Sequence, residues 1–410
     1  MKHLMIVGAV LGGLPIALAS ALAQNWTASR APSTNWVAVA SSADGTKLAA
    51  AAGGAGTNGP IFISADSGIT WAQSGAPIRN WAAIGSSAHG NEWVAAENGG
   101  AVYRSTNSGA NWQVTDSPCA PWQAIASSGD GAKLVAVYAG GLLEGGIYIS
   151  TNSGTTWTAT AAPTNGWYSV AGSADGTRLT AMMVDSLTPG GPYGWVFLST
   201  NGGATWTQSA RVRWPTSLAA SADGMGLMAA QGENGPLPGS ILTSSNSGAT
   251  WSLTGAPGAA WSSVACSADG THQVAAIGGL FGGPISGSIY LSADSGATWS
   301  ATGAPTNCWA SVASSADGCR LVAAVNGGGI YTWQATPTPA LNITPTGNGL
   351  VISWVIPSMS FVLQQNSGLN PTNWTNVATP PVLNLTNLQN QVTLSPPGAA
   401  TFYRLKSLAP

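Results

Sequence analysis

Charged side chains are scarce in this sequence. Of its 410 residues, 12 are Lys or Arg and 14 are Asp or Glu, and the formal net charge is −2. Nucleic-acid binding requires clustered basic residues that displace counterions from phosphates, and the Lys and Arg residues here do not cluster. We therefore expect no nucleic-acid partner and a surface covered largely by Ser, Thr, Asn and Gly.

Histidine and cysteine are also rare. After the N-terminal region only His89 and His272 remain, too few for a Ser–His–Asp triad or a histidine-based zinc site. The four cysteines are Cys119, Cys266, Cys308 and Cys319. Their spacing matches no zinc motif, which favours isolated thiols, with a Cys266–Cys319 bridge as the alternative. We expect no metal and no cofactor.

The N-terminus has the pattern of a secretory signal. A basic start at Lys2 precedes a mostly apolar stretch over residues 4–19, and Ala21-Leu22-Ala23 supplies a small-x-small cleavage pattern. A membrane anchor is the alternative, but two glycines and a proline shorten the apolar stretch below the length of a bilayer span. The pattern predicts a signal peptide over residues 1–23 and a secreted or cell-surface protein without a membrane span after cleavage.

Two short repeats alternate along the chain. The first is an octapeptide of the form Ser-x-(Asp/Asn)-(Ser/Gly)-Gly-x-(Thr/Asn)-Trp, present six times. Its third residues are Asp66, Asn107, Asn152, Asn201, Asn246 and Asp294, and its last residues are Trp71, Trp112, Trp157, Trp206, Trp251 and Trp299. The second repeat resembles Trp-x-x-Val-Ala-x-Ser-Ala-Asp-Gly and occurs seven times, at intervals of 41 to 48 residues. It begins at Trp36, Trp81, Trp122, Trp167, Trp214, Trp261 and Trp309.

The octapeptide resembles the Asp-box, or BNR repeat, of sialidase-like and photosystem-assembly-factor-like propellers. A period in the forties with several short strands per unit is typical of a β-propeller. In the first unit, alternation and turn residues predict strands over 36–41, 47–51 and 61–64 and from residue 70 onward. We therefore predict an all-β fold with four-stranded blades.

The spacing of the repeats predicts how the ring closes. Ten residues separate each box Trp from the next inner-strand Trp in five cases and eight in the sixth, from Trp206 to Trp214. Trp26 also lies ten residues before Trp36 although no box precedes it, whereas the last unit ends at Trp333 without a box. A strand over residues 25–31 would complete the blade that begins at Trp309 and cover both sheet edges. The prediction is a seven-bladed β-propeller over residues 24–335.

The repeats end at a Pro/Thr linker over residues 336–340. Residues 341–410 contain further predicted strands and are expected to form a small β-sandwich-like domain. This region resembles the fibronectin-like C-terminal modules of secreted bacterial proteins, a resemblance that implies an accessory or surface-attachment role.

The boxes themselves do not predict catalysis. Their third residue is Asp in two copies and Asn in four. Asn can replace Asp where the side chain accepts backbone hydrogen bonds in a turn, but not where a general acid or nucleophile is needed. We therefore interpret the boxes as structural turns, with the box tryptophans packed between sheets.

Five other acidic residues are the candidates for catalysis, if the protein is an enzyme. They are Glu97, Asp116, Glu144, Asp185 and Glu233. A glycosidase needs two carboxylates facing each other across the bond that it cleaves. The three substrate-binding arginines of sialidases are not recognisable, since the closest match to the first motif is Arg30-Ala31-Pro32. Solvated loop residues are the alternative interpretation of these acids.

Uneven loops point to a binding site. The repeats vary in length mainly in the loops between the second and third strands of blades 4, 5 and 6, around residues 185–194, 231–239 and 278–287. These loops and the blade connections share one face of a propeller, which we call the loop face. The predicted ligand-binding residues there are Tyr193, Trp195, Arg211, Arg213, Glu233 and Phe281.

The seven inner-strand tryptophans are further binding candidates, because aromatic faces grip sugars and protein loops. Packing as a repeated core is the alternative for these rings. We expect a monomer that binds a glycan or a protein without catalysis. A divergent glycoside hydrolase of the sialidase or xyloglucanase kind and a cell-surface scaffold are the alternative functions.

Overall fold

The computed structural model describes residues 25–54, 56–140, 144–185, 193–233, 238–278, 285–336, 339–347, 349–357, 360–368, 373–395 and 401–408. Every regular element among them is a β-strand, which confirms the all-β prediction. Within these ranges there is no helix long and apolar enough to cross a membrane. The predicted signal peptide lies outside the described residues.

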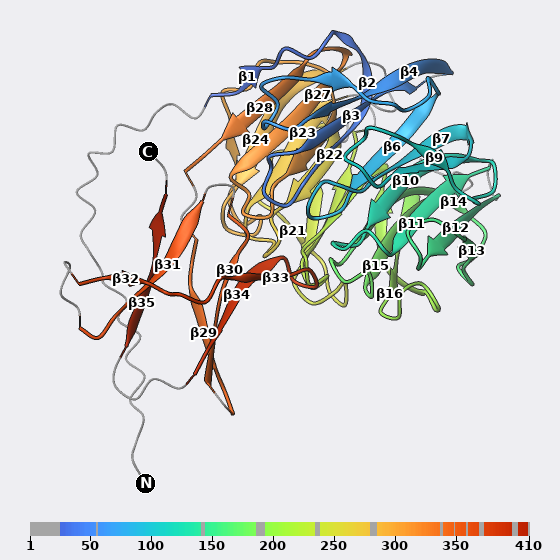
Figure 1. Ribbon diagram of the computed structural model, residues 1–410. Coiled ribbons are helices and arrows are strands. Elements are labelled where there is room, and N and C mark those ends of the chain that lie inside the picture. The colour runs from blue at the N-terminus through green and yellow to red at the C-terminus, as the bar shows by residue number, and fades with distance from the viewer. Residues whose placement is uncertain are drawn as a thin grey trace.

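The first 28 strands pair into antiparallel sets of four, which are the blades of a β-propeller (Figure 1). The inner strands are β2 (Thr34–Ser41), β6 (Trp81–Ser86), β10 (Ala120–Ser127), β14 (Gly166–Gly172), β18 (Pro215–Ala220), β22 (Trp261–Cys266) and β26 (Trp309–Ser314). The second strands are β3 (Leu48–Gly54), β7 (Trp93–Gly100), β11 (Leu134–Ala139), β15 (Leu179–Asp185), β19 (Leu227–Gln231), β23 (Gln273–Gly278) and β27 (Arg320–Gly328). The blades are numbered by the order of these strands.

The third strands are β4 (Thr57–Ser64), β8 (Val102–Ser105), β12 (Gly145–Ser150), β16 (Tyr193–Ser199), β20 (Ile241–Ser244), β24 (Ser286–Ser292) and β28 (Ile330–Gln334). The outer strands are β5 (Ala72–Gln73), β9 (Gln113–Val114), β13 (Thr158–Ala159), β17 (Thr207–Arg213), β21 (Ser252–Leu253), β25 (Ser300–Ala301) and β1 (Thr27–Ala28). Six outer strands have two residues, whereas β17 in blade 4 has seven.

The N-terminal strand completes the last blade, as the position of Trp26 predicts. Thr27 pairs with Thr332 and Ala28 with Tyr331, so that β1 is the outer neighbour of β28 (Figure 1). The Trp26 ring packs on Trp309 with centroids 6.2 Å apart and planes tilted by 40°. In blade 3, Trp157 packs on Trp122 at 6.4 Å and the same tilt. Trp26 therefore occupies the position that a box Trp fills in the other blades.

A closed ring of backbone hydrogen bonds joins the turns between the inner and second strands. One residue of each turn donates its N–H to the carbonyl of its counterpart in a neighbouring blade, over 2.6–2.8 Å. In order around the ring these residues are Ala43, Ala88, Gly129, Ala174, Ala222, Ala268 and Ala316, and Ala316 donates back to Ala43. The ring surrounds one end of the central channel, on what we call the turn face, and it passes once through every blade.

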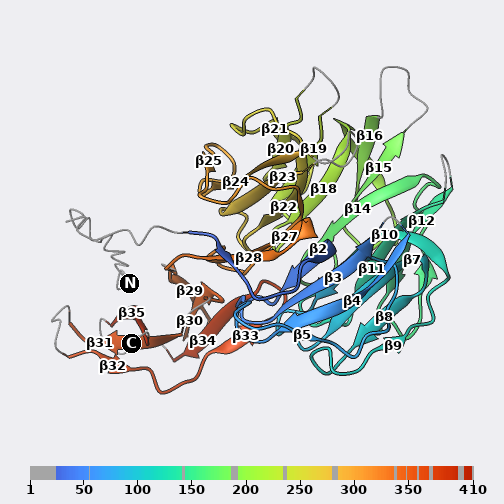
Figure 2. The same ribbon diagram turned by 90° about the horizontal axis from the view of Figure 1, so that it is seen from above.

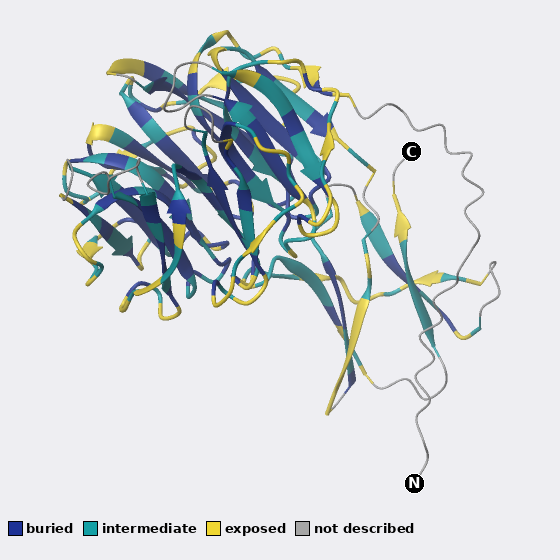
Figure 3. Ribbon diagram, turned by 180° about the vertical axis from the view of Figure 1, so that it is seen from behind, coloured by how far each residue is buried: buried dark blue, intermediate teal, exposed yellow. Residues whose placement is uncertain are grey.

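Small side chains allow the blades to converge. Between blades 1 and 2, for example, Ala49 and Ala51 are fully buried against Trp81. Bulky residues at these positions would separate the inner strands, since protein interiors are close-packed. At the turn face, basic side chains connect neighbouring blades: the Lys133 Nζ donates to the Asp175 carbonyl at 2.7 Å. Figure 3 shows the buried residues concentrated along the propeller strands and the exposed residues at their ends.

The C-terminal strands form two further antiparallel sheets. One contains β29 (Asn342–Thr346), β30 (Gly349–Val355), β34 (Gln389–Leu394) and β33 (Val382–Asn384), and the other contains β32 (Thr375–Asn376), β31 (Phe361–Asn366) and β35 (Phe402–Ser407). Both sheets contribute to one core, made by Ile352, Trp354, Leu363 and Val392. Figures 1 and 2 show these strands grouped at one side of the propeller.

Candidate functional site

The Asp-box turns are held by hydrogen bonds that Asp and Asn make equally. In the first box the Ser64 hydroxyl donates to Asp66 Oδ1 at 2.8 Å, and the same oxygen accepts the Thr70 N–H at 2.9 Å. In the third box Asn152 Oδ1 accepts the Thr156 N–H at 2.9 Å. These contacts require an oxygen acceptor rather than a negative charge, which agrees with the structural interpretation of the boxes.

The two acidic boxes make stability depend on pH. Hydrogen bonds from Thr298 lower the pKa of Asp294 from 3.8 to about 2, and those from Thr70 lower the pKa of Asp66. Because these pKa values are lower in the folded chain, the stability that they contribute is present above the unfolded-state pKa near 4. It is lost as the pH falls through the folded-state values.

Replacing both carboxylates by Asn should reduce the acid sensitivity of the fold. We expect Asp66→Asn together with Asp294→Asn to unfold at a nearly unchanged temperature at pH 7, because Asn fills this position in four boxes. Between about pH 4 and pH 2 the double variant should lose less stability than the wild type. Thermal unfolding across this range measures the effect. Asp116→Asn, which removes an exposed carboxylate outside the boxes, is the control. The prediction is contradicted if the double variant loses as much stability in acid as the wild type or this control.

Six inner-strand tryptophans are unavailable to a ligand, so the ligand-binding role predicted for them is wrong. These rings are 0–1% exposed: Trp36, Trp81, Trp122, Trp167, Trp261 and Trp309. A β-bulge follows each of them, and a bulge changes the direction of the side chains along its strand. The rings lie between blades, edge-on to aromatic residues such as Tyr103, whose centroid is 5.3 Å from that of Trp81. They are core residues, the alternative interpretation of the repeat.

Trp214 differs from the other six. It is half-buried, has a left-handed φ of 44°, and precedes the inner strand β18 instead of starting it. The cause is the long outer strand β17, which reaches Arg213 and leaves no room for a connecting loop. The shorter spacing from Trp206 to Trp214 was the sequence signal for this change. Trp214 therefore remains a candidate for ligand contact.

Four predicted binding residues lie together on strands β16 and β17. Tyr193 is paired with Arg213, and Trp195 with Arg211. The Arg211 guanidinium carbon lies 3.8 Å from the Tyr193 ring centroid and 6.0 Å from that of Trp195, and the Arg213 guanidinium carbon lies 5.7 Å from the Tyr193 ring. We call these four residues the aromatic–arginine cluster. It stands on a strand pair rather than a loop, so its geometry is fixed by backbone hydrogen bonds.

The two guanidinium groups of the cluster have no acidic partner among the described residues. Across the described ranges, the ion pair that is present joins Arg79 to Glu97, at 3.6 Å. Arg211 is exposed, and Arg213, Tyr193 and Trp195 are half-buried. A guanidinium stacked on a ring keeps its in-plane N–H donors free. The cluster can therefore receive an anionic group of a ligand.

The neighbouring blade borders the cluster. Gly232 donates its N–H to the Trp214 carbonyl at 2.8 Å, and Gln231 Oε1 accepts the Arg213 N–H at 3.4 Å. Glu233, predicted as a ligand contact, follows directly and is half-buried. Phe281, the remaining predicted contact, lies outside the described residues. Blades 4 and 5 thus supply this part of the loop face.

Two of the five candidate catalytic acids border the aromatic–arginine cluster, since Asp185 is paired with Tyr193 and Glu233 follows Gly232, and the other three lie elsewhere. Glu97 lies on β7 of blade 2, Asp185 at the end of β15 in blade 4, and Glu233 just after β19 in blade 5. Asp116 and Glu144 are exposed, in the connection that follows β9 and just before β12. Glu97 forms an ion pair with Arg79. In the described ranges, no three His, Cys, Asp or Glu residues are grouped so that they could hold a metal ion.

The cysteines are free thiols in this structure. Burial raises the pKa of Cys266 and of Cys319 to about 12, so both remain protonated near neutral pH. Cys119 is exposed.

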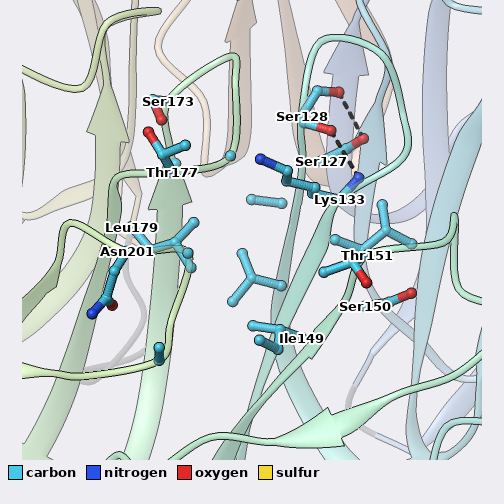
Figure 4. Close-up of a pocket in the computed structure, with 17 residues that line it drawn as sticks. Ser127, Ser128, Lys133, Ile149, Ser150, Thr151, Ser173, Thr177, Leu179 and Asn201 are labelled. Atoms are coloured by element: carbon cyan, nitrogen blue, oxygen red, sulfur yellow. Dashed lines mark hydrogen bonds between the residues drawn. The ribbon is translucent and has the colours of Figure 1, made fainter.

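A groove of about 300 Å³ separates blades 3 and 4 near the turn face. Figure 4 shows Thr177 and Leu179 of blade 4 across from Lys133 and Ile149 of blade 3. Gly202 of the fourth box, where the other boxes have Ser, is among the residues that line this groove. Since Lys133 is committed to the Asp175 carbonyl, the groove offers less for ligand recognition than the aromatic–arginine cluster.

Comparisons with known proteins establish the fold alone. No family model matches the chain, and no curated protein matches its sequence. Among solved structures, YCF48 from Cyanidioschyzon merolae is similar over 76% of this chain and 98% of its own, with 17% identity and a TM-score of 0.56. Hydrazine synthase from Kuenenia stuttgartiensis is similar over 75% of this chain and 97% of its own, with 11% identity and a TM-score of 0.60. A structure of YCF48 bound to a D1 peptide is similar over 76% and 94%, with 15% identity and a TM-score of 0.55.

Proposed function

We propose that this protein is an exported β-propeller that binds an anionic glycan through the aromatic–arginine cluster of blade 4. The observation that carries the proposal is a pair of arginines beside two aromatic rings, with Arg211 stacked on Tyr193 and with no ion pair to either arginine among the described residues. In a sequence with 12 basic residues in total, two that share one surface and form no ion pair within the described ranges suggest a ligand that supplies negative charge.

The chemistry of the cluster matches an acidic sugar. Aromatic rings pack against the apolar face of a pyranose, and a guanidinium forms paired hydrogen bonds with a carboxylate or a sulfate. Trp214 and Glu233 beside the cluster would contact neighbouring sugars or hydroxyl groups. Neutral sugars would use the rings but leave the arginines unpaired, which predicts a preference for acidic glycans.

Binding of the mature chain, residues 24–410, to a panel of acidic and neutral glycans tests the proposal. We expect retention of uronate-containing or sulfated glycans, and a 10- to 100-fold weaker affinity for Arg211→Ala and for Arg213→Ala, about the range for charged hydrogen bonds. Trp195→Ala should weaken binding to acidic glycans as well. Arg30→Ala is the matched control, because Arg30 is exposed and distant along the chain. Unchanged binding in both cluster variants, or equal retention of neutral glycans, would contradict the proposal.

A protein ligand is the second candidate. YCF48 has been solved bound to a D1 peptide, and a stacked arginine pair would also suit an acidic peptide segment. Retention of proteins without retention of any glycan in the same panel would favour this candidate. Hydrolysis of a retained glycan would instead favour the glycoside hydrolase alternative, with the five acids named above as its candidates.

The C-terminal strands support a proposal of their own. Their two sheets share one core, and we propose that they form a small sandwich domain of the fibronectin-like kind. Together with export through the predicted signal peptide, this domain would place the propeller outside the cell or at its surface, the scaffold role included.

A further inference from the structure

The turn that connects β33 to β34 lies at the turn-face end of the central channel. Leu385 and Leu388 of this turn pack with Val355 and Ile356 against an apolar floor. The floor is made by ring residues of blades 1, 2, 6 and 7, namely Ala43, Ala88, Ala268 and Ala316. In Figure 1 the β33–β34 hairpin lies directly below the propeller. We call this floor the alanine socket.

Leu388 also borders the interior of the channel. It lines a cavity of about 160 Å³ together with inner-strand residues that include Ser41, Ser127 and Cys266. Its backbone is left-handed, with φ of 54°, and its carbonyl accepts the Ile356 N–H at 3.1 Å. A branched side chain adopts this conformation at a cost, and Leu388 holds it while half-buried against the socket.

The propeller repeat departs from its pattern where the turn approaches most closely. Six residues of the hydrogen-bonded ring are alanine, and the seventh is Gly129 in blade 3. Its φ is not left-handed, so the backbone itself does not require glycine. A Cβ added there would lie 2.7 Å from the Leu385 carbonyl oxygen and 3.2 Å from Leu388 Cδ2. The missing methyl group makes room for the turn.

We infer that the alanine socket is an intramolecular docking surface, and that its partner is the turn over residues 385–388 of the same chain. Docking closes the channel at the turn face and holds the C-terminal sheets in a fixed position against the propeller. The turn face is then occupied, and a ligand that reaches the channel must enter from the loop face. This inference does not depend on the identity of the ligand.

Gly129→Ala in the full chain tests the inference. It restores the residue that the other six blades carry, so the propeller should unfold at an unchanged temperature. The added methyl group should displace the turn: we expect amide hydrogen exchange over residues 383–390 to be about tenfold faster and the radius of gyration in small-angle scattering to increase. Ala222→Gly is the control, because it also changes the ring by one methyl group, in blade 5 and outside the socket.

A second pair of variants tests the same surface from the other side. Leu388→Asp places a charge in the socket but spares the core between the two C-terminal sheets, to which Leu388 does not belong. Val382→Asp adds the same charge at an exposed position of β33. Leu388→Asp should release the turn and speed amide exchange over residues 383–390 about as much as Gly129→Ala does, whereas Val382→Asp should behave as the wild type. Wild-type exchange and scattering in both Gly129→Ala and Leu388→Asp would overturn the inference, and so would equal release by Val382→Asp.

Discussion

Trp26→Ala should destabilise the protein by about 3–5 kcal/mol, the range for removing a buried tryptophan, and lower its unfolding temperature by roughly 5–8 °C. Trp26 is 7% exposed, packs on Trp309, and donates its Nε1–H to Thr302 Oγ1 at 2.9 Å. It anchors a two-residue strand that no peptide bond links to the rest of its blade. Loss of the ring should therefore also free the edge of β28 and promote association between molecules.

The control for this prediction is Trp157→Ala. Trp157 makes the same contacts in blade 3: its ring packs on Trp122 with the same tilt, and its Nε1–H donates to Thr115 Oγ1 at 3.1 Å. The box turn, however, ties it covalently to its own third strand, and its ring is only half-buried. Urea unfolding and light scattering should show a smaller loss and no association for Trp157→Ala. An equal loss of stability and equal association in the two variants would contradict the prediction that β1 depends on Trp26 more than a covalently linked outer strand depends on its box Trp.

A second large effect is expected at the inner-strand tryptophans, and it should depend on the indole N–H. Trp81→Ala and Trp122→Ala should each cost about 3–5 kcal/mol, because both rings are fully buried. The two phenylalanine variants should differ from each other. Trp122 Nε1 donates to the Gly100 carbonyl at 3.1 Å, whereas the buried Trp81 Nε1 has no partner.

Removing a satisfied donor leaves its acceptor unpaired, while removing an unsatisfied donor removes a cost. Trp122→Phe should therefore be more destabilising than Trp81→Phe by about 1–3 kcal/mol, although both changes remove the same volume next to a tyrosine. Urea unfolding of the four variants measures the difference. A Trp81→Phe variant as unstable as Trp122→Phe would contradict the prediction.

The repeats were sufficient to predict how the blades are built. The recurring Trp positions predict the inner strands, and the isolated Trp26, ten residues before Trp36, predicts the closing strand. The packing of the inner-strand tryptophans was not predictable from alternation, since a bulge after each ring shifts the pattern by one residue. Trp81, a predicted ligand contact with core packing as the alternative, belongs to the core.

The candidate site was predictable in part. Tyr193, Trp195, Arg211 and Arg213 are predicted from the uneven loop and blade connection of blade 4. The structure brings them together because β17 has seven residues where its counterparts have two. The contact between Gly129 and the turn over residues 385–388 joins segments more than 250 positions apart. The sequence carried a trace of it, a glycine where six copies have alanine, but nothing in the repeat indicated what fills the space.

The closed hydrogen-bonded ring at the turn face has an evolutionary consequence. Open repeat arrays gain or lose copies readily, because each unit contacts only its two neighbours and the ends are free. Here every turn donates to one neighbour and accepts from the other, through all seven blades. A recombination event that adds or deletes one blade would leave the circle unable to close at its present radius. The ring geometry therefore constrains the number of blades more tightly than the sequence of any one blade, and blade 4 keeps its place in the ring although its outer strand β17 is longer than the others.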